Sequence, residues 1–108
     1  MGNEIHSTEI FDDWLDGLKD RVGRIAILKR IERASKGNFG DHKPIKDEKI
    51  KGLYEMRIDS GPGYRVYYGQ TGRFIYLLVS GGIKKDQQRD VDSAKSLWKQ
   101  IKEQGHDQ

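Results

Sequence analysis

Hydrophobic residues recur at helical spacing in the first third of the chain. Thr8 is a candidate N-cap, because its hydroxyl can accept a hydrogen bond from a free backbone N–H in the first turn of a helix. The residues that follow it lie at positions i, i+3, i+4 and i+7, the spacing of one apolar helix face: Phe11, Trp14, Leu15 and Leu18. The pattern predicts an amphipathic helix that continues through Gly17.

A second helix is predicted from Arg21 to Lys36, with Gly37 as its stop signal. Its expected apolar face consists of six residues: Val22, Ile25, Leu28 and Ile31, widened by Ala26 and Ile27. Because only Lys19 and Asp20 link the two segments, we expect an antiparallel helical hairpin. A third helix is predicted over residues 87–104, with an apolar face formed by Val91, Ala94, Leu97, Trp98 and Ile101.

Between the second and third helices the hydrophobic period changes to two, which is typical of strands. After a polar loop over residues 37–51, strands are predicted at 53–59, 64–68 and 74–79. Gly61-Pro62-Gly63 and the segment 69–72 are the predicted turns, and Gly81-Gly82 is expected to end the third strand. Because the segment 74–79 is apolar at successive positions, it is expected to be a central strand that is covered on both faces.

The order of these elements predicts a single α+β domain over residues 1–108. We expect an antiparallel sheet, made of a short N-terminal strand at Glu4–Ser7 and a three-stranded meander, with an N-terminal helical hairpin and a C-terminal helix packed on it. Residues 105–108 are expected to form a loose tail.

Composition narrows the possible classes of protein. The chain has no cysteine, which excludes disulfides, a thiolate nucleophile and a cysteine-based zinc site. No apolar run reaches the ~18 residues of a membrane span, and the N-terminal segment does not resemble a secretory signal. We therefore expect a cytoplasmic protein that does not contact a membrane.

Charge is segregated along the chain. Residues 1–20 contain one Lys/Arg and six Asp/Glu, whereas residues 21–85 contain fifteen Lys/Arg and six Asp/Glu. Such an asymmetry favours a surface that binds a polyanion. Lysine and arginine side chains on solvent-exposed helix faces would give the same pattern. The candidate RNA-binding residues are Arg24, Arg30, Arg33, Lys43, Lys46, Lys49, Lys51 and Lys85. The same surface would suit an acidic protein segment, since both ligands present negative charge.

A candidate catalytic patch lies on two neighbouring strands. Residues that alternate along paired antiparallel strands share a face, which predicts that Glu55, Arg57, Arg65 and Tyr67 converge, with Lys84 at the rim. Arginine and lysine can hold a scissile phosphate, and Glu55 or Lys84 could move a proton from a ribose 2′-hydroxyl. Tyr67 could stack on a base. The alternative is a surface ion-pair lattice that only keeps the sheet soluble.

Histidine offers little support for metal or nucleophilic chemistry. His6, His42 and His106 lie in the opening segment, the basic loop and the tail, and no two of them have metal-ligand spacing. We therefore predict no metal site and no cofactor.

Several motifs together resemble the HigB-like "addiction module killer protein" group of the RelE/ParE toxin superfamily. These motifs are Gly37-Asn38-Phe39-Gly40-Asp41-His42-Lys43, Leu53-Tyr54-Glu55-Met56-Arg57-Ile58, Gly61-Pro62-Gly63-Tyr64-Arg65-Val66-Tyr67-Tyr68, Gly81-Gly82-Ile83-Lys84, and Gln87 with Asp90-Val91. The resemblance runs from about Phe11 to Trp98.

This resemblance implies a RelE-like, microbial-ribonuclease-type fold and a toxin of a type II toxin–antitoxin module. It implies a ribosome-dependent mRNA endoribonuclease (an mRNA interferase) that arrests growth. It also implies neutralisation by a helix-turn-helix antitoxin. The chain would then be bound to operator DNA only indirectly, through this antitoxin. Arg65 matches the family's phosphate-contacting arginine, and Arg57 and Lys84 lie near its other basic positions. Two alternatives stay open, a ParE-like gyrase poison that acts by binding, and a non-catalytic co-repressor.

Overall fold

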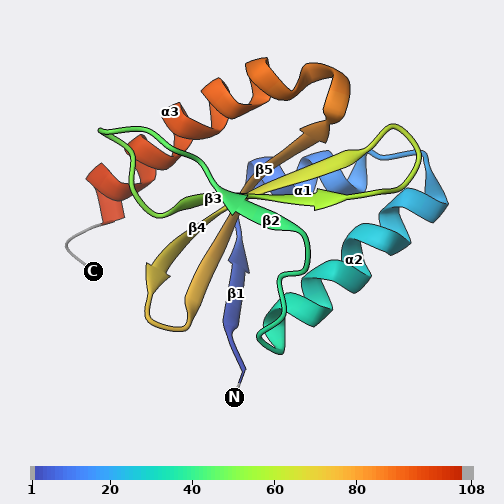
Figure 1. The fold of residues 1–108 in the computed structure, drawn as a ribbon, viewed down its shortest axis with the longest axis horizontal. Helices are drawn as coiled ribbons and strands as arrows, with labels where there is room; N and C mark the ends of the chain where they lie inside the picture. The colour runs from blue at the N-terminus through green and yellow to red at the C-terminus, as the bar shows by residue number, and fades with distance from the viewer. Residues whose placement is uncertain (1, 106–108) are drawn as a thin grey trace.

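The computed structural model describes residues 2–105 (Figure 1). In chain order its elements are β1 (Glu4–Ser7), α1 (Glu9–Asp16), α2 (Arg21–Ser35), β2 (His42–Pro44), β3 (Leu53–Ile58), β4 (Tyr64–Gly72), β5 (Ile75–Ile83), a 3-10 turn η1 (Lys84–Asp86) and α3 (Gln87–Gly105). The α+β class and the C-terminal helix are confirmed. Gly105 ends α3, and the remainder of the predicted tail lies outside the described residues.

The strands form one five-stranded sheet in the order β1-β5-β4-β3-β2. The predicted meander β3-β4-β5 is antiparallel, and β1 is parallel to β5 at its outer edge. At the opposite edge, β2 pairs with β3 antiparallel, so that Lys43 lies opposite Glu55. This last strand was not predicted, because its three residues are all polar or proline and carry no alternating pattern.

Two predicted turns are in fact strand. β4 continues through the segment 69–72, with irregular pairing after Tyr67 and after Gln70. β5 likewise runs through Gly81-Gly82 to Ile83. Large side chains of the helices lie on these glycines: a Cβ at Gly69 would come within 2.4 Å of the Trp98 ring, and one at Gly81 within 2.3 Å of the Trp14 ring. These glycines therefore make room for helix packing and do not end the strands.

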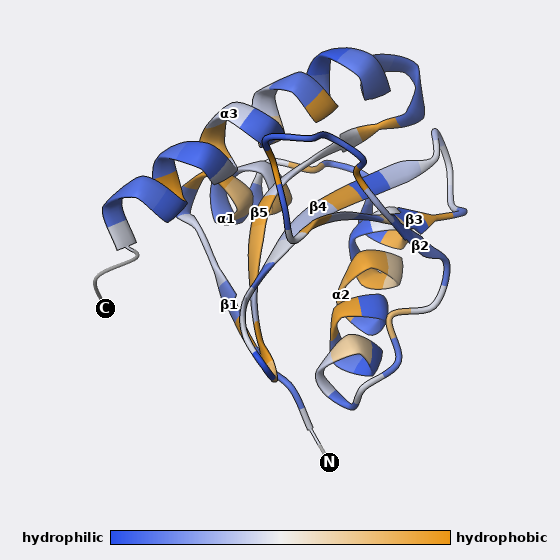
Figure 2. Cartoon of the chain, turned by 60° about the vertical axis from the view of Figure 1, so that its left-hand side comes forward, coloured by the Kyte–Doolittle hydropathy of each residue, from blue (hydrophilic) through white to orange (hydrophobic). Residues whose placement is uncertain are grey.

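Helices cover both faces of the sheet, and each face has its own core (Figure 2). On one face, residues of α1 and α2 pack on β3, β4 and β5 around Phe11, Ile27 and Val66. On the other face, α3 packs through Ala94 and Trp98 against strand residues such as Val79. Neighbouring residues of β5, Leu78 and Val79, belong to different cores, which confirms that this strand is covered on both faces.

The first helix begins as predicted and ends one residue earlier than Gly17. The Thr8 hydroxyl accepts a hydrogen bond from the Phe11 N–H at 3.0 Å, which caps α1. Gly17 is the C-cap, with its N–H donating to Asp13. The chain then turns back into α2 (Figure 1), and α1 contacts β5 whereas α2 contacts β3.

The predicted apolar face of α2 is only partly the face that packs on the sheet, because Ala26, Ile27 and Ile31 belong to this core but the other three predicted residues do not. Val22, Ile25 and Leu28 are 73%, 50% and 48% exposed, whereas Ile27 and Ala34 are buried. Gly23 is also buried, and it lies so close to the Tyr64 ring that a Cβ there would come within 2.4 Å of it. The buried stripe therefore contains a glycine and an alanine, which a count of large apolar residues does not detect.

Replacing Gly23 by alanine should destabilise the protein, although alanine in a helix interior normally stabilises by about 1 kcal/mol. The added Cβ would lie 2.4 Å from Tyr64 Cε2 and 2.6 Å from Asp20 Oδ2. We expect the free energy of unfolding to fall by about 1–3 kcal/mol, as in overpacked cores, in a urea titration. Gly17→Ala is the control, since it faces helix backbone only, and should change the free energy by less than about 1 kcal/mol. A stabilised Gly23→Ala variant would contradict the packing of α2.

The Tyr64 hydroxyl joins the sheet to the N-terminus of α2. It donates to Asp20 Oδ2 at 2.7 Å, while Asp20 Oδ1 accepts from the Gly23 N–H. Burial, together with the hydrogen bond to Asp20, raises the pKa of Tyr64 from 10.0 to about 12. A raised pKa means that the folded state holds this proton more tightly. The resulting stability is complete below pH 10 and is lost as the pH rises to about 12.

Tyr64→Phe should therefore flatten part of the alkaline loss of stability. Chemical denaturation at pH 8, 10 and 11.5 should show wild-type stability falling more steeply across this range than that of the variant. Equal slopes for the two proteins would contradict the assigned hydrogen bond.

Candidate active site

The paired strands β3 and β4 bring four of the predicted residues to one face of the sheet. In the register of these strands Glu55 lies opposite Tyr67, and Arg57 lies opposite Arg65. Directly opposed residues of an antiparallel pair point to the same side, so the predicted shared face is confirmed.

The sequence predicts that this face is open to solvent, but in the structure it is covered. Glu55, Tyr67 and Arg65 are 1%, 0% and 8% exposed, because α3 crosses the same side of the sheet. The expectation that Tyr67 presents its ring to a base is therefore wrong for this structure. The alternative of a surface ion-pair lattice is also wrong for Glu55 and Arg65, because both are buried.

Glu55 is held by two other polar side chains. The Gln87 side-chain amide donates to both of its carboxylate oxygens, at 2.8 and 3.0 Å. Arg65 Nε lies 3.7 Å from Glu55 Oε2, and an Arg65 Nη1 hydrogen bond to the Tyr64 carbonyl at 3.3 Å fixes the guanidinium further. The buried carboxylate is thus balanced by a neighbouring cation, as a charge in a protein interior requires.

Tyr67 and Ser80 complete this buried polar cluster. They are paired across β4 and β5, and within the described chain both hydroxyls are buried without a hydrogen-bond partner. Burial, followed by the charges of Glu55 and Asp90, raises the pKa of Tyr67, which keeps the phenol protonated. Asp90 reaches the cluster across Gly82, where a Cβ would come within 2.0 Å of Asp90 Oδ2.

Two of the three cations expected to hold phosphate, Arg65 and Lys84, lie beside the Gly61-Pro62-Gly63 turn of the β3–β4 hairpin. Lys84 is exposed and donates its backbone N–H to the Gly63 carbonyl at 2.7 Å. A Cβ at Gly63 would lie 3.2 Å from Lys84 Cβ and 3.7 Å from Arg65 Nη1, which places both side chains beside this turn. Arg57, the third cation, lies opposite Arg65 in the strand register, but its guanidinium is paired with Asp41 in the segment before β2, with Nη2 3.1 Å from Oδ1.

A cleft of about 870 Å³ runs between the β2 edge and the first turns of α3. It gives access to the buried polar cluster at Glu55 and Gln87. The other residues that line it are Lys43, Pro44, Ile45, Lys46, Gln88, Val91 and Lys95. Three of these are lysines, so an anionic ligand would be attracted towards Glu55.

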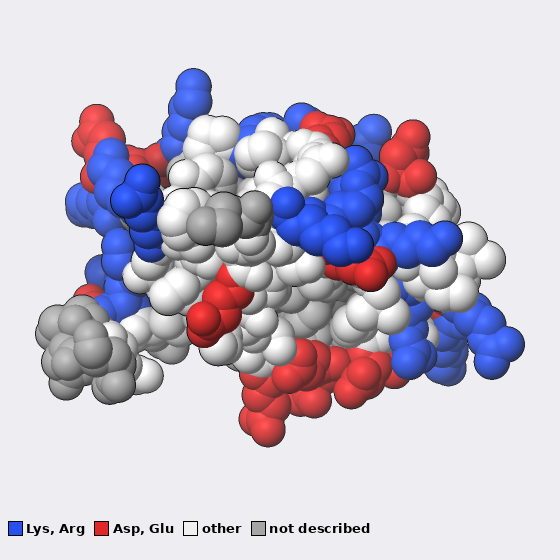
Figure 3. Space-filling view, turned by 90° about the horizontal axis from the view of Figure 1, so that it is seen from below, with Lys and Arg blue, Asp and Glu red and all other residues white. Residues whose placement is uncertain are grey.

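The predicted RNA-binding residues are divided between two faces. Lys43 is exposed on β2, Lys46, Lys49 and Lys51 are exposed on the loop that follows it beside α3, and Lys85 is exposed in η1. Arg24 and Arg33 are exposed on α2, which packs on the opposite face of the sheet. In Figure 3 an acidic group lies along the lower edge of the molecule, while basic side chains interspersed with acidic ones lie on both sides above it.

Arg30 is a correction to the predicted set. Its guanidinium donates to the backbone carbonyls of Arg57, Phe39 and Asp41 at 2.6, 2.8 and 3.2 Å. Burial is the main reason that the pKa of Arg30 is lowered. These bonds anchor the segment after α2 to β3, which is a structural role and leaves the guanidinium unavailable to phosphate.

Sequence analysis missed the roles of Gln87, Asp90 and Ser80. Gln87 and Asp90 were noted as part of a family motif, but their spacing at the start of a helix gave them no role. Ser80 follows an apolar run, and this polar residue was a further signal that a polar group points into this core. His6 and His42 are exposed and lie outside the cluster, and His106 lies beyond the described residues.

Among residues 2–105 no group of three or more His, Asp or Glu residues is placed to hold a metal ion. None of the helices described is both long and apolar enough to cross a membrane.

Comparison with known proteins places the chain in a family. The family described as "Phage derived protein Gp49-like (DUF891)" matches residues 13–102. The chain belongs to the Gp49-like family. Gp49-like proteins are of the RelE/HigB-like toxin type, so the resemblance seen in the sequence is confirmed at this level. The chain is also 40% identical over 101 residues to a Haemophilus influenzae (strain Rd) protein described as "Uncharacterized protein", covering 94% of this chain and 98% of the relative.

Proposed function

We propose that this Gp49-like chain is the toxin of a type II toxin–antitoxin module and cleaves mRNA as an endoribonuclease on the ribosome. The observation that carries the proposal is the position of Arg65 and Lys84 beside the turn of the β3–β4 hairpin, with Arg57 opposite Arg65 in the strand register, near a lysine-rimmed cleft that reaches Glu55. Cations placed around one carboxylate suit a reaction in which negative charge develops on phosphate.

The proposed reaction needs no group beyond the RNA and the protein. The ribose 2′-oxygen attacks the adjacent phosphorus while its proton passes to the Glu55 carboxylate. The bond from phosphorus to the 5′-oxygen breaks, and that oxygen takes a proton from the Lys84 ammonium group. The products are a 2′,3′-cyclic phosphate and a 5′-hydroxyl. Because the nucleophile belongs to the substrate, holding the strand in the attacking geometry supplies much of the acceleration.

Access to Glu55 depends on Gln87. The amide of Gln87 occupies both carboxylate oxygens, so an RNA strand reaches this base only after those hydrogen bonds are released. Tyr67 is proposed to act from beneath, as a protonated phenol that keeps the cluster polar, because its ring is fully buried.

The partners follow from the charge of the surface. We propose that the exposed arginines of α2, Arg24 and Arg33, contact ribosomal RNA without sequence preference. We also propose that a helix-turn-helix antitoxin neutralises the toxin through an acidic segment that competes for a basic surface.

A second candidate function is favoured by the burial of Glu55 and Tyr67. A closed polar cluster would also serve a toxin that acts by binding alone, as a gyrase poison does. The two functions differ in the nucleic acid that is damaged.

Induced expression without the antitoxin, followed by mapping of transcript ends and of gyrase cleavage complexes, distinguishes these functions. We expect growth arrest with new internal ends in translated mRNA and no accumulation of gyrase complexes. Trapped gyrase with intact mRNA would replace the proposal by the second candidate. Normal growth with intact mRNA would favour a non-catalytic co-repressor.

A further inference from the structure

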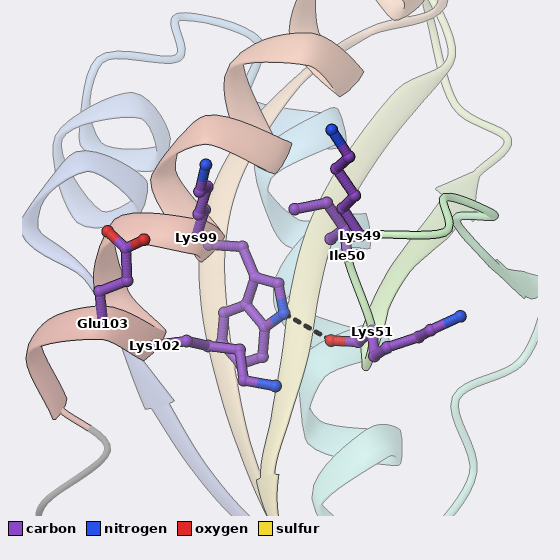
Figure 4. Close-up of a pocket in the computed structure, with 7 residues that line it drawn as sticks. Lys49, Ile50, Lys51, Lys99, Lys102 and Glu103 are labelled. Atoms are coloured by element: carbon purple, nitrogen blue, oxygen red, sulfur yellow. Dashed lines mark hydrogen bonds between the residues drawn. The ribbon is translucent and has the colours of Figure 1, made fainter.

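A second basic surface lies along the C-terminal half of α3, and we call it the distal lysine cluster. It surrounds a pocket of about 470 Å³ with four lysines: Lys49, Lys51, Lys99 and Lys102. Ile50 and Trp98 form its apolar floor, and among the residues that line it Glu103 supplies the one carboxylate. Figure 4 shows the lysines coming from two segments, the loop before β3 and α3, with their ammonium groups spread around the indole.

The backbone beneath these lysines is firmly held. Trp98 is 1% exposed and its Nε1 donates to the Lys51 carbonyl at 2.8 Å, the dashed bond in Figure 4. Lys102 Nζ lies 5.6 Å from the centre of the same ring, which is a cation–π contact. Ile50 packs into the core formed by α3. The loop and the helix therefore present their lysines in a fixed arrangement.

The charge of the cluster is not neutralised by its neighbours. Within residues 2–105, none of the four lysines has a carboxylate within ion-pair distance, whereas nearby Lys95 lies 3.1 Å from Asp47. Grouped like charges repel one another, and a polyanion that bridges them removes this repulsion and releases counterions.

The cluster continues the line of the proposed active-site cleft. Gln87, Gln88, Val91 and Lys95 line the cleft, and Trp98, Lys99 and Lys102 follow on the next turns of the same helix. From Gln87 to Lys102 the helix rises roughly 22 Å at 1.5 Å per residue. A stacked strand with ~3.4 Å between nucleotides covers this length with about seven nucleotides.

We propose that the distal lysine cluster binds the phosphate backbone of the RNA strand that is cut, about seven nucleotides from the cleavage site. The identity of the strand rests on the proposed function, but the binding itself does not require cleavage. An acidic protein is a poorer fit, because protein interfaces depend on accessible aromatic and apolar anchors. Here the Trp98 ring is buried, and the cluster offers ammonium point charges, which suit phosphate.

The test measures binding of 2′-O-methyl oligonucleotides, which cannot form the cyclic phosphate, by fluorescence anisotropy at several salt concentrations. Oligonucleotides of 4 and 12 nucleotides are compared with wild type and with Lys99→Gln/Lys102→Gln. An independent variant, Lys49→Gln/Lys51→Gln, removes the loop half of the cluster. The charge-matched control is Lys19→Gln/Lys29→Gln, whose lysines are exposed on the side of α1 and α2. Circular dichroism confirms that each variant is folded.

We expect wild type to bind the 12-mer more tightly than the 4-mer, and each cluster variant to lose that advantage. The loss should be roughly 10–30-fold at ~0.1 M salt, with the salt slope reduced by about 1.4 for two lost contacts to a single strand. The control pair should keep wild-type affinity for both lengths.

Three results would overturn the inference. The control pair could weaken binding as much as the cluster variants, which would indicate only net charge. The 4-mer and the 12-mer could be affected equally, which would place the lysines at the cleft itself. Alternatively, in a parallel titration with polyglutamate, the cluster variants could lose binding of polyglutamate but not of RNA, which would assign the cluster to an acidic protein. If the cluster variants lose RNA binding as expected but the protein does not cut mRNA, the proposed function is contradicted. The binding of an RNA backbone by the distal lysine cluster would still be supported.

Discussion

Arg65→Ala is expected to abolish growth arrest and to lower the rate of mRNA cleavage by about 10²–10³-fold, the usual loss when one preorganised donor to a developing charge is removed. Arg65 lies beside Lys84 at the hairpin turn and beside Glu55 in the buried polar cluster. It is therefore the cation best placed both to stabilise a phosphate and to balance the charge of Glu55, the proposed base. The measurement is the rate of cleavage on translating ribosomes with purified protein.

Stability has to be separated from chemistry in this experiment. Glu55 is 1% exposed, and removing the partner of a buried charge costs about 3–5 kcal/mol. Arg65→Lys keeps a cation and should remain folded, but it loses the planar guanidinium and should cleave more slowly than wild type. Arg73→Ala is the matched control, since Arg73 is exposed and lies over Phe74. A folded Arg65→Ala variant that cleaves at the wild-type rate would remove Arg65 from the site.

Trp98→Ala should cost about 3–5 kcal/mol in the free energy of unfolding, the range for truncating a buried aromatic residue. Trp98 is 1% exposed and lies directly on Gly69 of β4, where a Cβ would come within 2.4 Å of the ring. It also fixes the loop before β3 through the Lys51 carbonyl. Its loss empties the core beneath α3 and removes the floor of the pocket at the distal lysine cluster. Denaturant titration followed by circular dichroism measures the effect.

Trp98→Phe separates the contribution of ring packing from that of the hydrogen bond to the Lys51 carbonyl. The phenyl ring keeps most of the packing but cannot donate to the Lys51 carbonyl. The expected loss is smaller than for alanine and includes about 1–3 kcal/mol for a buried acceptor left without its partner. If Trp98→Ala unfolds at the wild-type denaturant concentration, α3 does not depend on this core.

The sequence was a good guide to the strands of this fold because their pattern is local. Period two places Glu55 and Tyr67 on one face, and the register confirms it. The apolar run of β5 also predicts coverage of both faces. Both inferences need only the alternation of side chains along a strand.

The sequence was a poor guide wherever the outcome depends on packing between distant segments. Nothing in the pattern of α3 says which face of the sheet it covers, and that choice buries Glu55, Arg65 and Tyr67. The face of α2 depends on Gly23 fitting against Tyr64, a contact between small and large residues that hydrophobic periodicity does not record. Glycines in β4 and β5 were interpreted as turns for the same reason, since the rings that occupy their space come from other elements.

The most direct test of the central claim uses two mRNAs that differ at one position. The first is all-ribose, and the second carries a single 2′-deoxynucleotide at the cleavage site; both are presented on ribosomes to the purified protein. The account predicts that the first is cut to a 5′ fragment ending in a 2′,3′-cyclic phosphate and that the second stays intact at this site. Equal cutting of both strands would show that the 2′-hydroxyl is not the nucleophile, and would contradict the assignment of Glu55, Arg65 and Lys84 to this chemistry.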